Sequence, residues 1–216
     1  MPNIIARGTD GLTGTVGAAG SAGPDGANGK NAECHWNGDD PAGNGKDGGS
    51  GTSGSKGIDG QDGTNGSNVL IEVEDFIAGV DIDTRGGKGG NGGDGGKGGK
   101  GGNGGNGGSG SGCEDRGNGG DGGNGGKGGD AGRGGDGGKG GNITVVAQSI
   151  TTGTLNANSE GGAGGLAGNP GQGGDRGERG TGRNDGAQGN PGANGESSSN
   201  GTKGTDGSIN IIEEGA

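Results

Sequence analysis

The run GGKGGNGGDGGKGGKGGNGGNGG (residues 86–108) decides the fold of this chain. Glycine fills two of every three positions, and Lys, Asn or Asp fills the third. The repeat breaks at residues 113–116 (CEDR), resumes near Gly119 and continues to Gly141, with Ala131 in one glycine position. An extended left-handed helix with three residues per turn puts every third side chain on one face, so this period predicts polyglycine II helix.

Two further blocks carry a sparser repeat, with glycine at every third residue. One is interrupted over residues 30–47 and the other over residues 181–185. Each interruption falls near the middle of its block. A chain that leaves a base and returns must fold back halfway, so we interpret the interruptions as the tips of three long hairpins. We call the blocks arm one (residues 8–67), arm two (86–141) and arm three (159–207).

Between the arms, apolar and polar residues alternate, which is typical of short strands. Two of these segments each read as two strands, joined at Ala78-Gly79 in one and near Thr152-Gly153 in the other. We therefore predict a single domain, a bundle of about six polyglycine II helices arranged as three hairpins on a small β base, with essentially no α-helix. The predicted base strands lie in residues 3–7, 68–85, 142–158 and 208–213.

The glycine pattern also predicts how the arms pack. A polyglycine II helix has no internal hydrogen bonds, so its backbone groups need neighbours, and a neighbour can approach only over a face without side chains. Gly-Gly-X offers two such faces and Gly-X-Y offers one. We expect arm two inside, arms one and three outside, and the X residues of arm two in water. Disorder and collagen are the alternatives; centred interruptions argue against the first, and Gly-Gly-X with only five Pro argues against the second.

Composition excludes several classes of protein. Only 19% of the 216 residues are hydrophobic, which is too little for one globular core, and the net charge of −11 should repel nucleic acid and anionic membranes. No stretch is apolar and long enough to insert in a membrane, and none reads as a signal peptide. The chain matches the nucleotide-binding motif GxGxxG many times, but these matches arise from the glycine repeat and do not indicate a nucleotide site. We expect no catalytic site, no cofactor and no enzymatic activity.

The two cysteines, Cys34 and Cys113, lie at the predicted tips of arms one and two. Two cysteines are too few for a disulfide framework or a structural zinc site, but they suffice for one bridge. We predict a Cys34–Cys113 disulfide, which indicates an oxidising compartment and hence an extracellular or virion-surface location.

The tip of arm one holds the only His and the only Trp of the chain. Trp anchors interfaces, so we interpret this tip as a contact site; the alternative is that Trp36 covers the disulfide and the helix ends. One His beside an oxidised Cys argues against a metal or nucleophile, and loop solvation explains Asp39, Asp40, Asn44 and Asp47 without Ca²⁺, so we predict no metal. The candidate contact residues are His35, Trp36, Asn37, Asp39, Asp40, Glu114, Asp115, Arg116, Arg183, Asn184 and Asp185.

The outgoing half of arm one carries small, mostly uncharged residues in register every third position. Such an array could form a flat surface suited to ice; a plain exterior face or a packing face against another copy are the alternatives. These residues are Thr9, Leu12, Thr15, Ala18, Ser21, Pro24 and Ala27.

Three families resemble this chain in its glycine runs. Springtail antifreeze proteins share the repeat and a few disulfides, but the strands and many charges here depart from them. Receptor-binding adhesins of T-even-type phage tail fibres are similar in alternating Gly-rich runs with variable tips, but this chain has few aromatics. The N-terminal glycine-rich domain of Obg GTPases resembles it as a β base bearing such helices, but no GTPase sequence is present. These resemblances imply an architecture, because fold does not establish function.

Three functional hypotheses remain from the sequence. The first is a rigid extracellular or virion-surface spike or adhesion module whose tips contact a cell-surface or protein receptor. The second is an ice-binding protein that uses the array on arm one, and the third is a passive structural surface protein. Oligomers could form through the β base or the outer arms.

Overall fold

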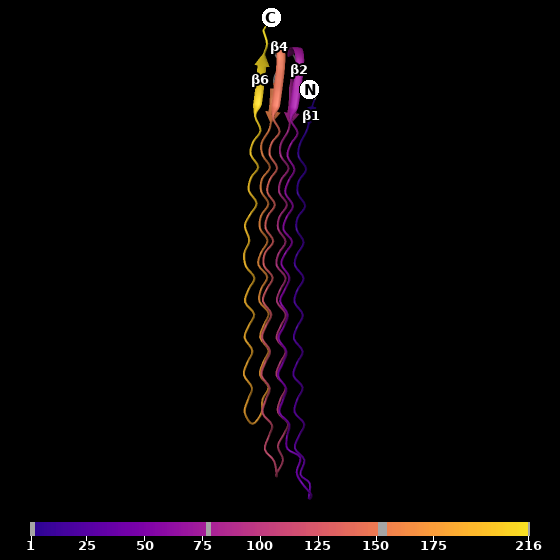
Figure 1. The fold of residues 1–216 in the computed structure, drawn as a ribbon, viewed down its shortest axis with the longest axis vertical. Coiled ribbons are helices and arrows are strands. Elements are labelled where there is room, and N and C mark those ends of the chain that lie inside the picture. The colour runs from indigo at the N-terminus through magenta and orange to yellow at the C-terminus, as the bar shows by residue number, and fades with distance from the viewer. Residues whose placement is uncertain (1–2, 77–78, 151–154, 216) are drawn as a thin grey trace.

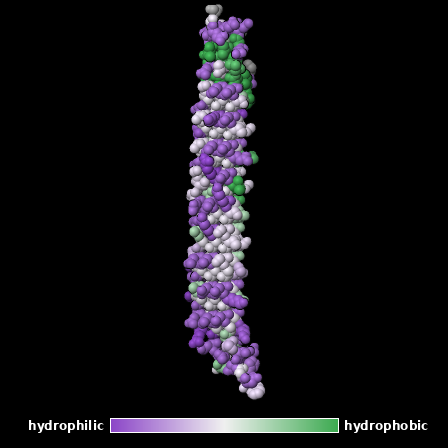
Figure 2. Space-filling view, viewed as in Figure 1, coloured by the Kyte–Doolittle hydropathy of each residue, from purple (hydrophilic) through white to green (hydrophobic). Residues whose placement is uncertain are grey.

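The computed structural model describes residues 3–76, 79–150 and 155–215, and it shows a long, narrow rod (Figure 1). Strands occupy one end, near which both ends of the chain lie, and extended segments run from them along the rod. The described residues contain no α-helix and no helix able to cross a membrane. Hydrophobic residues gather at the strand end, whereas most of the rod surface is polar or neutral (Figure 2).

In the part of the chain that the structure describes, six short strands form the base: β1 (Asn3–Ile5), β2 (Val69–Phe76), β3 (Val80–Asp83), β4 (Ile143–Ile150), β5 (Leu155–Asn158) and β6 (Ile209–Glu213). They make two sheets with the orders β1-β3-β5 and β2-β4-β6, and every pairing is parallel. Strands that are consecutive in the sequence, such as β2 and β3, therefore belong to different sheets. The predicted junction at Ala78 and the predicted turn at Thr152-Gly153 lie outside the described residues.

A small apolar core lies where the two strand sets meet. Ile82, Ile143 and Val145 are almost fully buried, and Phe76, Val80 and Ala147 complete the cluster. The five larger side chains of this cluster contribute about 8–15 kcal/mol of transfer free energy. Ordering the backbone costs about 1–2 kcal/mol per residue over the whole chain. The rest of the rod must therefore be stabilised mainly by its own backbone hydrogen bonds.

Six extended legs continue from the strands. Three leave the base and three return to it (Figure 1). They are leg 1 (residues 8–32), leg 2 (43–67), leg 3 (86–109), leg 4 (117–141), leg 5 (160–181) and leg 6 (186–208).

The legs form two layers, and each layer continues one sheet. In the layer of legs 1, 3 and 5, a glycine N–H of one leg donates to a third-position carbonyl of the next, as Gly11 does to Lys88 at 2.7 Å. The ladder passes from β1 into leg 1 without a break, because Ala6 N–H already donates to the Asp83 carbonyl at 2.8 Å. Strand β1 ends at Ile5, two residues before the end predicted from the sequence, although the backbone pairing continues into leg 1.

Legs of opposite layers run antiparallel, and Gly-Gly-X serves both directions at once. In leg 3, Gly92 N–H donates within its layer to the Leu166 carbonyl, and Gly93 N–H donates across to the Ile58 carbonyl, both at 2.8 Å. A Cβ on Gly93 would overlap the carbonyl oxygen of Thr15. Arm two consequently lies between arms one and three, bonded to both.

In many repeats, the N–H of the third residue donates to an Asp or Asn side chain of the preceding leg in the same layer. Lys88 N–H donates to Asp10 Oδ1 at 2.7 Å, and Ala187 N–H donates to Asp121 Oδ1 at 2.7 Å. Among the described residues, the acceptors that bridge neighbouring legs of a layer in this way are Asp or Asn, not the longer Glu or Gln. The bond from the Thr202 N–H lowers the pKa of the Asp136 carboxyl. We call these side-chain bonds between legs Asx caps.

Candidate functional site

The tip of arm one is a small, hydrogen-bonded hairpin turn. Glu33 and Asp40 form an antiparallel bridge, in which each N–H donates to the carbonyl of the other residue at 3.0 and 2.8 Å. His35 N–H donates to Asp39 Oδ1 at 3.0 Å, inside this bridge. Gly38 has φ +136°, a conformation that side-chain-bearing residues rarely adopt, and it allows the chain to reverse here. The tip is therefore an ordered turn.

Trp36 projects from this turn into solvent with 98% of its surface exposed. This exposure rules out the alternative that Trp36 covers the disulfide or the ends of the legs. A fully exposed indole at the far end of a rod is the kind of group that a partner could bury.

The predicted Cys34–Cys113 disulfide is confirmed, and it joins the tips of arms one and two across a sequence separation of 79 residues. Ser111 lies against the bridge, with its Oγ 3.0 Å from each sulfur atom. In arm two, Ser111 N–H donates to the Glu114 carbonyl at 2.9 Å, which closes the turn. The bridge is compatible with an extracellular location.

The tip of arm three lies beside the tip of arm two. Arg183 Nη1 lies 3.1 Å from Asp115 Oδ2, and Arg183 N–H donates to the Gly117 carbonyl at 2.8 Å. The backbone carbonyl of Asn184 accepts a hydrogen bond from the Gly119 N–H at 2.9 Å. Figure 1 shows that arm three turns back before the other two arms. The predicted contact residues of arm three are thus set back from the rod's extremity.

The structure brings together three potential ligands that the sequence analysis did not combine. The carboxylates of Glu33 and Asp40 and the imidazole of His35 each offer an atom within 4.8 Å of the others. His35 Nε2 lies 3.4 Å from Glu33 Oε2. Sequence reasoning considered His35 beside Cys34 and left Glu33 out; the period-two spacing of Glu33 and His35 in an extended segment was the available signal.

The predicted array of arm one is exposed, and leg 2 adds a second column beside it. Thr64 N–H donates to the Thr9 carbonyl at 3.0 Å, and the two Oγ1 atoms are 3.1 Å apart. We call this two-column surface the arm-one edge. Its columns are Thr9, Leu12, Thr15, Ala18, Ser21, Pro24 and Ala27 from leg 1, and Lys46, Gly49, Thr52, Ser55, Ile58, Gln61 and Thr64 from leg 2.

The arm-one edge is regular and nearly uncharged, since Lys46 is its single charged residue. The residues of each column recur at every third position of their leg. Leu12 and Ile58 are 67% and 59% exposed. In arm two, the positions equivalent to these columns are glycines because another leg lies there. Side chains at the edge therefore stop a further leg from packing in the same way.

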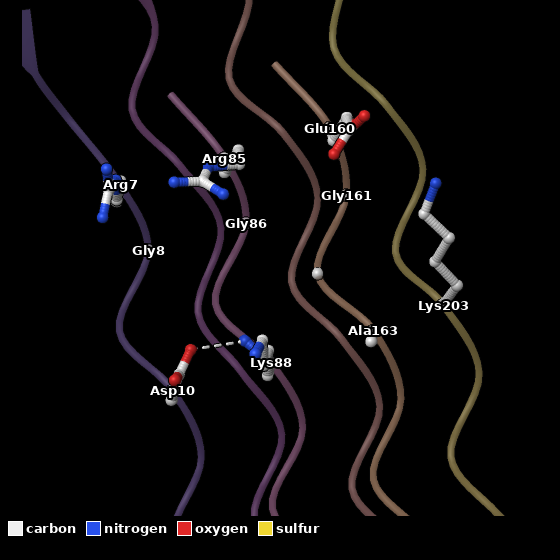
Figure 3. Close-up of a pocket in the computed structure, with 11 residues that line it drawn as sticks. Arg7, Gly8, Asp10, Arg85, Gly86, Lys88, Glu160, Gly161, Ala163 and Lys203 are labelled. Carbon is white, nitrogen blue, oxygen red and sulfur yellow. Dashed lines mark hydrogen bonds between the residues drawn. The ribbon is translucent and has the colours of Figure 1, made fainter. Parts of the chain in front are cut away.

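A shallow groove of about 450 Å³ lies at the base end of the layer of legs 1, 3 and 5 (Figure 3). Arg7, Arg85 and Lys88 line it. The guanidinium groups of Arg85 and Arg7 both pair with Asp83, at 2.9 and 2.7 Å, and lower its pKa to about 2. Asp83 pairs with both guanidinium groups, and the carboxylates of Asp10 and Glu160 also line the groove, so its negative charges offset most of the positive ones and it supports no strong anion site. The Arg7–Asp83–Arg85 cluster joins leg 1 to leg 3 where the sheet ends.

Comparison with known proteins adds little. No known family and no curated protein matches the chain. Among solved structures, it is similar to the nine polyproline type II helical bundle springtail antifreeze protein from Granisotoma rainieri, with 24% sequence identity over 87% of this chain and 93% of that chain. The TM-score is 0.14, which is too low to indicate a shared fold.

Proposed function

We propose that the chain is a non-enzymatic, rigid bundle of polyglycine II helices, folded as three hairpins on a β base, that presents the tip of arm one to a receptor. We place it at an extracellular or virion surface. The observation that carries the proposal is Trp36, 98% exposed at the distal end of the rod.

The architecture suits this role. Each leg has about 25 residues, so the tip stands about 75 Å from the base at the rise of a three-fold extended helix. The disulfide and the Arg183–Asp115 ion pair join the three tips to one another. A contact surface that is ordered before binding loses little conformational entropy in the complex.

The test is the binding of the oxidised protein to arrays of glycans and cell-surface ectodomains, with the W36A variant beside it. Truncating a Trp that anchors an interface costs about 2 kcal/mol or more, which corresponds to at least a roughly 30-fold loss of affinity. L12A is the matched control, because Leu12 is also an exposed apolar residue but lies on the side of the rod. Equal binding by W36A and the parent protein, or no binding to any array, would sink the proposal.

Ice binding is the second candidate, and the two-column geometry of the arm-one edge favours it. A flat, regular and nearly uncharged surface can order water on a lattice, whereas a charged surface holds its own hydration. Thermal hysteresis of the purified protein tests this candidate. T15D should abolish the activity, while S53D, on the neighbouring face of leg 2, should retain it. Absence of hysteresis at high concentration removes the candidate. If both tests fail, the remaining hypothesis is a passive structural protein.

A further inference from the structure

The tip of arm one holds three metal-ligating side chains in a restrained arrangement. The donor atoms of Glu33, His35 and Asp40 all lie within 4.8 Å of one another. The two carboxylates come from the residues that form the antiparallel bridge, so two backbone hydrogen bonds place them opposite each other. His35 lies two residues after Glu33, and its Nε2 is 3.4 Å from Glu33 Oε2, so the two side chains reach the same side of the tip.

Further contacts restrain the backbone that carries these groups. His35 N–H donates to Asp39 Oδ1 at 3.0 Å, and Gly38 N–H approaches the His35 carbonyl at 3.4 Å. Cys34, between Glu33 and His35, is tied to arm two by the disulfide. The three ligands are therefore brought together by the fold and not by chance proximity of flexible side chains alone.

We infer that Glu33, His35 and Asp40 bind one divalent transition metal ion of the Zn²⁺ class. One imidazole nitrogen and two carboxylate oxygens suit zinc and its neighbours, and three protein ligands leave a position for water or a donor from a partner. Ca²⁺ does not fit, because it takes six to eight oxygen ligands. This inference does not rest on the proposed receptor-binding function.

Local charge favours a cation at this tip. Glu33, Asp39 and Asp40 are acidic, in a chain whose net charge is −11. Two carboxylates that share one site repel each other, and a bound cation relieves that repulsion. The nearby group of Cys34, Asp39 and Cys113 is not a second site in the oxidised protein, because both sulfur atoms are in the disulfide.

The experiment is calorimetric titration of the oxidised protein with ZnCl₂. We expect saturation at one Zn²⁺ per chain, and we expect Co²⁺ at the same site to give a visible absorption spectrum that Zn²⁺ abolishes. H35A should weaken binding at least about 100-fold, because losing a group that merely supports a metal ligand already costs 10–100-fold. E33Q and D40N should weaken it too.

D175N is the matched control, since it removes the same charge from an exposed position on leg 5. The melting temperature of each metal-free variant verifies that it is folded. No saturable Zn²⁺ binding by the parent protein, or equal binding by H35A, would overturn the inference. W36A retains all three ligands and should bind Zn²⁺ normally, so this experiment and the receptor test can fail independently.

Discussion

Replacing Gly96 by Ala tests the packing of the rod at its centre. Gly96 lies in leg 3, where its N–H donates to the Ser55 carbonyl at 2.9 Å and its carbonyl accepts the Gly129 N–H at 2.8 Å. A Cβ built on Gly96 would overlap the carbonyl oxygen and carbon of Ala18 in leg 1. Both sides of this overlap are backbone, so no flexible side chain can move aside. Leg 1 must shift away from leg 3.

The magnitude follows from the bonds that such a shift strains. Gly17 N–H donates to the Asp94 carbonyl and Gly20 N–H to the Lys97 carbonyl, each at 2.8 Å, on either side of Ala18. Losing two such bonds costs about 1 kcal/mol each. Overpacking adds about 1–3 kcal/mol. Ala also lowers the conformational entropy of the unfolded chain, which stabilises the folded protein by about 0.4–1 kcal/mol and offsets part of this loss. We expect a net loss of about 2–5 kcal/mol, or roughly 5–20 °C in melting temperature for a chain of this size.

The assay is thermal unfolding of the oxidised protein followed by calorimetry, and G112A is the control. Gly112 has no neighbouring atom within 4 Å of a built Cβ, so the same substitution there should be neutral or slightly stabilising. A melting temperature of G96A within about 2 °C of the G112A value would refute the reasoning, since the expected loss is several-fold larger.

Three further predictions concern the caps, the base and the disulfide. D62A removes the Asx cap on the Asp136 N–H (2.7 Å) and should cost about 1 kcal/mol by urea unfolding, whereas D62N keeps the acceptor and should retain most of it. The folded pKa of Asp83 is lowered to about 2, so its ion pairs stabilise the protein fully above pH 4, and this contribution is lost as the pH falls through 2. Relative to D83N, the advantage should be about 1–2 kcal/mol at pH 7, discounted for the half-exposed arginines, and acid titrations of unfolding should show it mostly lost at pH 2 and absent below that pH. The double variant C34S/C113S should lose roughly 4–5 kcal/mol of unfolding free energy, measured by chemical denaturation, because the bridge closes a loop across 79 residues. In each of these three tests, unchanged stability would contradict the role of the contact that was removed.

The hydrophobic alternation of the sequence predicts where strands lie but not which strands pair. Alternation located the apolar segments because a strand with one buried face repeats every two residues, and β3 buries Val80 and Ile82 in this way. The same pattern does not say which strand is the partner. Val80 pairs in register with Leu155, 75 residues away, and not with the preceding strand. Such long-range parallel pairing depends on where the arms return, which no local signal records.

The Asx caps were visible in the sequence only after the register of the legs was known. Asp47 bonds to the N–H of Asp121, and Asp62 to that of Asp136, both 74 residues further on. The separation is constant within each pair of neighbouring legs (for example 78 residues between legs 1 and 3 and 74 between legs 2 and 4), and it is the signal that sequence reasoning missed. It also gives the many Asp and Asn residues of the repeat a structural role, since loop solvation alone would not select short side chains in phase.

At the tip of arm one, some features could be predicted from the sequence and others could not. The positions of Cys34 and Cys113 at two interruptions of the repeat predicted the disulfide, which the structure contains. The sequence did not predict that Trp36 would be fully exposed or that His35 would meet Glu33 and Asp40. Those facts depend on the turn at Gly38 and on the cross-strand bridge, which form only when the tip folds.

By itself, the sequence determined the local conformation of this protein and the faces that can pack. Glycine at every third position, or at two of three, decides where a neighbouring backbone can approach, because a Cβ at such a position would overlap a carbonyl of the next leg. Only the tertiary structure decided which leg is that neighbour, which strands share a sheet, and which side chains form the tip and the arm-one edge. The physical reason is that the backbone groups of the described legs form their hydrogen bonds with other legs, so their partners come from distant parts of the chain.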